Sequence, residues 1–184
     1  MNEVGGRTAR ITGTAILAAL VVVFDYALKF SGLKIPFPWL PFLKFDFTGV
    51  PIVLSLLLYG LSSGATTSAG ACLAIVARSG DLVGAVMKAL AELSTVAGVA
   101  AGMRLPGSLG RTVSLVVGVA LRIAVMSLVN LVVIPAYYGM PFQVAVDLLP
   151  MIGAFNALQG GMTVLLGYLI YEAYVSRVLF GRSG

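Results

Sequence analysis

Apolar runs as long as a membrane is thick constrain this sequence more than any other feature. The first covers residues 11–30, and comparable runs recur along the chain. Each helical crossing needs about 20 apolar residues. Hydrophobic residues make up 59% of the chain and charged residues 10%, against about 45–50% and 25% in a soluble domain. The 184 residues therefore predict a single all-α integral membrane domain, with no room for a separate soluble domain.

Turn residues divide the chain into six predicted helices. Their ranges are residues 11–30, 48–60, 65–77, 82–103, 112–138 and 151–179. Thr48 is placed to cap the second helix, and Pro51 falls in its first turn. Pro36, Pro38 and Pro41 forbid a helix in the connection after the first span. Because this connection is rich in aromatic residues, we expect it to lie at the membrane surface or to fold over a cavity.

Basic residues lie mostly between the apolar runs, as a membrane topology requires. Six spans put both termini on one side of the membrane. That side receives six arginines: Arg7, Arg10, Arg104, Arg111, Arg177 and Arg182. The opposite loops hold Lys34, Lys44 and Arg78. The positive-inside rule predicts cytoplasmic termini for a protein of the cell membrane, so the net charge of +5 needs no nucleic-acid partner.

Several kinds of chemistry are excluded by the residues that the sequence lacks. There is no histidine, and Cys72 is the only cysteine, which excludes histidine acid–base catalysis, Cys/His zinc sites and intrachain disulfides. The phosphate loop G-x-x-x-x-G-K-[ST] and the motifs H-E-x-x-H and G-x-S-x-G are also missing. We predict a protein that is not an enzyme. If it moves a solute, the energy must come from a gradient or from another subunit.

Three carboxamides fall on the last two predicted helices, where a polar side chain needs a partner. Asn130 lies late in one helix, and Asn156 and Gln159 lie early in the next. The spacing of Asn156 and Gln159 puts both on one helix face, near the membrane half that holds Asn130. Such amides either join helices by hydrogen bonds or present donors and acceptors to a neutral ligand such as a flavin ring. Three together favour a binding site.

Charged residues within the spans are predicted to pair with each other. Lys88 and Glu92 are four residues apart on one helix, and Lys88 lies near enough to the outer end to reach a ligand. Asp25 and Lys29 repeat this spacing near a helix end, where snorkelling to the interface is expected. Arg122 is expected to pair with an acidic residue that the sequence does not identify.

Aromatic and small residues mark two further surfaces. Tyr137, Tyr138 and Trp39 fall near the predicted interface, where an aromatic belt is expected, and stacking on a ligand is the alternative. Small residues recur at four-residue spacing, which permits close helix contact within the chain or with a partner. These pairs are Ala15/Ala19, Gly60/Gly64, Gly80/Gly84 and Gly98/Gly102.

Four short stretches together resemble a known family. They are LKFDFTGVP at 43–51, LLYG at 57–60, NLVVIPAY at 130–137 and FNALQG at 155–160. In this order, and in a chain of this size with six predicted spans, the sequence resembles the riboflavin-binding S component of energy-coupling factor (ECF) transporters. The resemblance covers nearly the whole chain and implies a six-helix S-component fold.

The resemblance also implies a function, partners and site residues. It implies a subunit that captures riboflavin from outside and is energised by a transmembrane T component and two ATP-binding subunits, with loops after the first and third helices covering the site. Asn130 and Asn156 would hydrogen-bond the flavin ring, and Gly84 and Lys88 would lie beside it. The face carrying Ala15/Ala19 would meet the T component.

The sequence departs from the family pattern at three positions. That pattern usually has Lys in place of Gln159, Asn in place of Lys88 and Asp in place of Gly49. Gln159 keeps a donor and adds an acceptor, which is compatible with flavin binding but could change affinity or ligand. The alternatives are an S component for FMN or another vitamin, a membrane scaffold that binds nothing, and a gradient-driven carrier acting alone.

Overall fold

Six helices and one short hairpin make up the part of the chain that the computed structural model describes, residues 6–180, with side chains described to residue 177. The helices are α1 (Arg7–Phe30), α2 (Gly49–Tyr59), α3 (Leu61–Ser79), α4 (Leu82–Gly102), α5 (Gly107–Tyr138) and α6 (Phe142–Phe180). The hairpin consists of the antiparallel strands β1 (Ile35–Phe37) and β2 (Leu40–Phe45). The predicted all-helical membrane fold is confirmed, and the hairpin is an addition to it.

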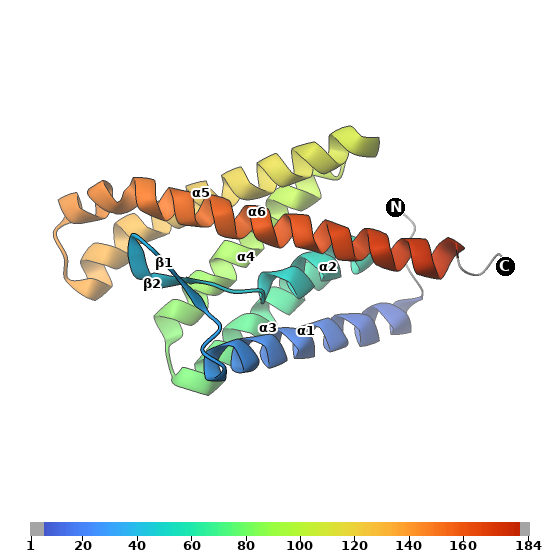
Figure 1. Cartoon of the computed structure of the whole chain (residues 1–184), viewed down its shortest axis with the longest axis horizontal. Helices are drawn as coiled ribbons and strands as arrows, with labels where there is room; N and C mark the ends of the chain where they lie inside the picture. The colour runs from blue at the N-terminus through green and yellow to red at the C-terminus, as the bar shows by residue number, and fades with distance from the viewer. Residues whose placement is uncertain (1–5, 181–184) are drawn as a thin grey trace.

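The helices form a bundle in which the first and last helices have their free ends at one side. Figure 1 shows the start of α1, the end of α6 and the α4–α5 turn at one end of the bundle, and the α3–α4 and α5–α6 turns at the other. Helices α1, α4, α5 and α6 are long and apolar enough to cross a membrane, whereas α2 has only 11 residues. Arg182, counted among the basic residues above, lies outside the described residues.

Four helices begin earlier than the sequence predicts. Helix α1 starts at Arg7 rather than residue 11. Helix α3 starts at Leu61 rather than residue 65, because Gly60, with φ +89°, ends α2 and lets α3 follow directly. Helix α5 starts at 107 rather than 112. Helix α6 starts at 142 rather than 151 and contains Pro150, which the sequence places in a loop. Inside a helix a proline leaves the carbonyl four residues earlier without its hydrogen bond, and here that residue, Val146, is 36% exposed.

Two apolar cores hold the bundle together. One lies among α1, α2, α3, α4 and α6, around Ile52, Leu56 and Val96. The other joins the hairpin to the C-terminal part of α5 and the N-terminal part of α6, where the ring of Phe37 contacts that of Phe155 at 5.6 Å between centroids. This second core fixes the hairpin against α6 and so positions the roof of the cavity described below.

The small-residue spacing has different consequences at different pairs. Gly98 faces α5, where a β-carbon would come within 2.6 Å of the Val117 carbonyl oxygen and 2.7 Å of the Gly118 α-carbon. Gly60 and Gly80 instead end helices with positive φ angles. Close helix packing, as predicted, therefore applies to the α4–α5 contact. Ala15 and Ala19 are exposed, so their role in partner contact stays a prediction.

Replacing Gly98 by alanine is expected to destabilise the fold by about 1–3 kcal/mol, because the added methyl group meets backbone atoms that cannot rotate away. Gly161→Ala is the matched control: a β-carbon there meets nothing within 4 Å, and alanine favours a helix. Thermal unfolding in detergent measures both. Equal melting temperatures for the two variants would contradict this account of the α4–α5 contact.

Candidate functional site

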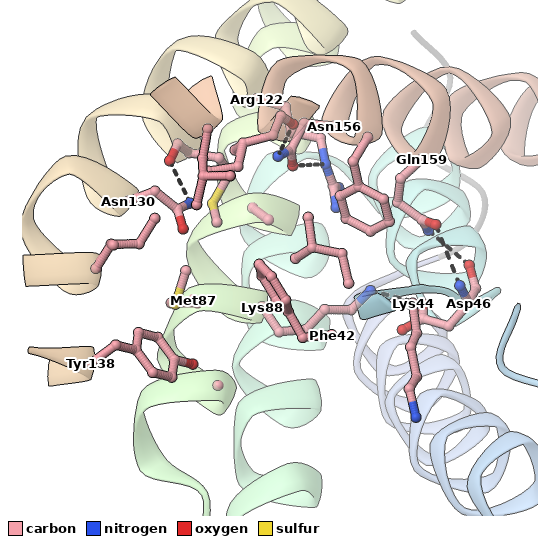
Figure 2. A pocket seen from close by; sticks show the side chains of 18 of the residues that line it. Phe42, Lys44, Asp46, Met87, Lys88, Arg122, Asn130, Tyr138, Asn156 and Gln159 are labelled. Atoms are coloured by element: carbon pink, nitrogen blue, oxygen red, sulfur yellow. Dashed lines mark hydrogen bonds and ion pairs between the residues drawn. The ribbon is translucent and has the colours of Figure 1, made fainter. Parts of the chain in front are cut away.

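A cavity of about 450 Å³ lies between the hairpin and the parts of α4, α5 and α6 nearest the α3–α4 and α5–α6 turns. Its walls are mainly apolar and include Met87, Met126, Ile134 and Leu148. Figure 2 shows side chains from all these elements directed into one space. Cavities of this size that are mostly apolar with a few placed polar groups are typical of small-molecule sites.

All three predicted carboxamides line this cavity. Asn130, Asn156 and Gln159 are 6%, 3% and 2% exposed, and they reach the cavity from α5 and α6. The expected convergence of these side chains is thus observed. Their part in binding a ligand stays a prediction, because the contacts they already make differ from one amide to the next.

Asn130 is the amide with the most free hydrogen-bonding capacity. Its Nδ2 donates to the Met126 carbonyl oxygen at 2.7 Å, within α5. Among the described residues its side-chain oxygen has no donor, and Figure 2 shows that oxygen facing the cavity. Asn156 is more engaged, because Nδ2 donates to the Ile152 carbonyl oxygen and Oδ1 accepts from Arg122 Nε at 3.1 Å.

Gln159 holds the chain segment that precedes α2. Its Nε2 donates to the Asp46 carbonyl oxygen at 2.7 Å, and its Oε1 accepts from the Asp46 backbone N–H at 3.3 Å. The amide therefore pairs with the backbone as a neighbouring strand would. Sequence reasoning assigned Gln159 to the ligand; the structure gives it a positioning contact as well as a place in the wall.

Four charged groups form a chain at the cavity wall, of which Asp46, Lys88 and Arg122 line the cavity and Glu92 is buried behind them. Lys88 Nζ lies 2.8 Å from Asp46 Oδ1 and 2.9 Å from Glu92 Oε1. Arg122 Nη1 lies 3.2 Å from the same Glu92 oxygen. Two positive and two negative groups thus compensate each other. The predicted Lys88–Glu92 pair is confirmed, and Glu92 is the partner that the sequence did not identify for Arg122.

Asp46 is the functional residue that sequence reasoning missed. Its Oδ1 accepts from the backbone N–H and the hydroxyl of Thr48 at 3.1 and 2.7 Å. Thr48 makes no side-chain cap, so the expected Thr48 cap is wrong, and Asp46 instead holds Thr48 at the start of α2. An Asp three residues before the helix start, and two before Thr48, was the available signal. Burial opposes ionisation of Asp46, but Lys88 and these hydrogen bonds outweigh it and lower its pKa.

The lowered pKa of Asp46 predicts a pH dependence. A carboxyl whose pKa is lower in the folded state stabilises the fold above its unfolded pKa, and this contribution is lost as the pH falls through the folded value. The difference in unfolding free energy between wild type and Asp46→Asn should stay constant between about pH 5 and 8 and shrink below about pH 4. Melting curves across this range measure it; a gap that closes near neutral pH would contradict the assignment.

The remaining predicted ligand contacts divide into two groups. Gly84 and Lys88 line the cavity on α4. Tyr137 does not line it and is 60% exposed, while its neighbour Tyr138 does, because a helix turns successive side chains to different sides. Tyr138, and not the predicted Tyr137, is thus the tyrosine in the cavity wall. Trp39 packs on Phe37 and is 65% exposed.

Asp25 does not snorkel to the interface with Lys29, as the sequence suggested. It is 3% exposed and lies 2.7 Å from Lys34 Nζ and 2.6 Å from Arg78 Nε. These two cations come from the segment after α1 and from the end of α3. An unpaired buried carboxylate is costly, so Asp25 is stabilised by two cations from other segments of the fold.

Comparison with known proteins gives a likeness in structure and none in sequence. No protein-family model matches this sequence, and no curated protein matches it. A solved structure described as the S component of a bacterial ECF transporter superposes with a TM-score of 0.78 and 23% sequence identity, over 93% of this chain and 98% of that chain. Together with the membrane-length helices, this shows that the chain has the S-component fold.

Proposed function

We propose that this chain is the substrate-binding subunit of an ECF-type transporter and that it captures riboflavin from outside the cell. The observation that carries the proposal is the apolar cavity at the outer part of an S-component fold, with the free Asn130 amide oxygen in its wall. The protein would have no enzymatic activity. It would lie in the cell membrane with both termini cytoplasmic.

The charge balance of the cavity favours a neutral ligand. Lys88 and Arg122 both line it, but Asp46 and Glu92 already compensate them. A phosphate would have to compete with these carboxylates for the two cations, whereas an isoalloxazine ring needs uncharged donors and acceptors. Riboflavin therefore fits the site better than FMN.

Transport requires partners, since the sequence contains no phosphate loop for ATP. A transmembrane T component and two ATP-binding subunits would supply the energy. Ala15 lies in a groove between α1 and α3, together with Ser62 and Thr66, at the end of the bundle that holds the termini. This groove and the exposed Ala19 form the proposed contact with the T component.

The purified protein tests the proposal directly. A preparation that carries flavin absorption bands, or that binds added riboflavin, supports it. Riboflavin at 100 times its dissociation constant should add about 2.7 kcal/mol to the free energy of unfolding, and FMN should compete poorly. If no flavin stabilises the protein, the remaining hypothesis is a membrane scaffold that binds nothing. Riboflavin uptake by this chain alone in liposomes would identify a gradient-driven carrier instead.

A further inference from the structure

The hairpin carries an apolar surface on the side turned away from the protein. We define its outer face as Leu33, Ile35, Pro36, Pro38 and Trp39, all of which are exposed. Leu33, Ile35 and Trp39 are 64%, 61% and 65% exposed. The side turned inward is different: Phe37 and Leu40 are buried against α5 and α6.

The hairpin lies within the depth of the membrane. Lys34 pairs with Asp25. Asp25 lies about 7.5 Å along α1 from Phe30, the last residue of that helix, at 1.5 Å per residue. Phe37 contacts Phe155, which is about 26 Å along α6 from Glu172. Glu172 pairs with Arg111 at the opposite end of the bundle. Because the hydrocarbon layer is about 30 Å thick, the hairpin lies near its outer boundary.

The hairpin also lies at the side of the bundle. Helix α2 packs between α1 and α6, and its 11 residues span only about 16 Å, half of the layer. Figure 1 shows the hairpin continuing beyond α2, from the end of α1 to α6. The same helices expose apolar residues of their own, among them Val23 on α1 and Leu165 on α6. The outer face is apolar like the exposed residues of these helices.

The backbone of the hairpin suits contact with lipid. Non-helical backbone is costly in hydrocarbon because its N–H groups need partners there. Pro36, Pro38 and Pro41 have no N–H group, and all three are exposed. Proline is the residue that can occupy an unpaired strand position without leaving a donor unsatisfied.

From this position, composition and backbone we infer that the outer face of the hairpin contacts phospholipid of the outer leaflet. The roof of the cavity would then be closed toward the side by lipid and not by water or by a second protein. Trp39, with its ring on Phe37, would lie at the level of the glycerol groups and upper acyl chains, where tryptophan is enriched in membrane proteins.

Native fluorescence tests this inference without any ligand, because Trp39 is the only tryptophan in the chain. The full chain is reconstituted in phosphatidylcholine vesicles whose acyl chains carry bromine near the carbonyl end, and quenching is compared with that by aqueous iodide. We expect bromine to reduce the emission about twofold and iodide to change it little. Efficient iodide quenching would place the face in water, and quenching by neither would place it under protein; both results overturn the inference.

Two relocated tryptophans calibrate the measurement. Trp39→Phe combined with Leu169→Trp places the probe on an exposed apolar position of α6 and should respond to brominated lipid. Trp39→Phe combined with Gln143→Trp places it about 43 Å along α6 from Glu172 and should respond to iodide. Neither result depends on whether the protein binds riboflavin.

Discussion

Replacing Asn130 by leucine is expected to weaken riboflavin binding by about 5- to 150-fold, equivalent to about 1–3 kcal/mol. The side-chain oxygen of Asn130 faces the cavity without a donor among the described residues. Leucine has a similar size, but a flavin donor placed against it would be buried without a partner. Titration of the purified protein with riboflavin, followed by flavin fluorescence, measures the change in dissociation constant.

Gln143→Leu provides the control for this prediction. Gln143 is an exposed amide on α6 that donates to Asp147 outside the cavity, so its loss should leave riboflavin affinity unchanged. The melting temperature of Asn130→Leu without ligand should also stay close to that of wild type, since its retained contact is with its own helix. Unchanged affinity in Asn130→Leu would remove this residue from the site.

Gln159→Leu should behave differently from Asn130→Leu. Both hydrogen bonds between the Gln159 amide and the Asp46 backbone would be lost, leaving buried backbone groups without partners. We therefore expect a lower melting temperature in the absence of ligand, together with weaker binding. The comparison of the two variants separates an amide that offers free capacity to a ligand from one that positions the chain.

The sequence predicted those parts of the fold and site that depend on local pattern. Apolar runs of membrane length predicted the helices, because a helix that crosses the hydrocarbon layer needs about 20 mainly apolar residues in succession. The amides of α5 and α6 could be placed together, since a short connection makes the two helices antiparallel neighbours. The i, i+4 relation of Lys88 and Glu92 is likewise local to one helix.

Features that depend on tertiary contact could not be predicted in this way. Asp25 and Asp46 obtain their partners from segments 9 to 53 residues away, and no spacing rule connects such positions. The hairpin forms although its residues include three prolines, because Phe37 packs into an apolar core with residues of α5 and α6. Pro150 predicts a helix break, yet α6 continues through it, at a place where the residue four positions earlier, Val146, is partly exposed.

The largest effect on stability is expected from Glu92→Leu. Glu92 is fully buried, and one of its oxygens contacts both Lys88 and Arg122. Its removal leaves two buried cations with one remaining carboxylate, Asp46. Breaking a buried ion pair from one side costs about 3–5 kcal/mol. Unfolding in mixed detergent measures the loss. Glu172→Gln, at the exposed pair with Arg111, should cost no more than about 1 kcal/mol.

A second substitution distinguishes charge imbalance from lost packing. If the cost of Glu92→Leu comes from an uncompensated cation, then Arg122→Met in the same chain should recover stability, because Lys88 and Asp46 then remain as a balanced pair. The double variant would be more stable than Glu92→Leu alone, although it has lost more hydrogen bonds. Simple addition of the two single losses would show that the four groups act independently. In that case charge balance would no longer support a neutral ligand, and the choice of riboflavin over FMN would rest on competition binding alone.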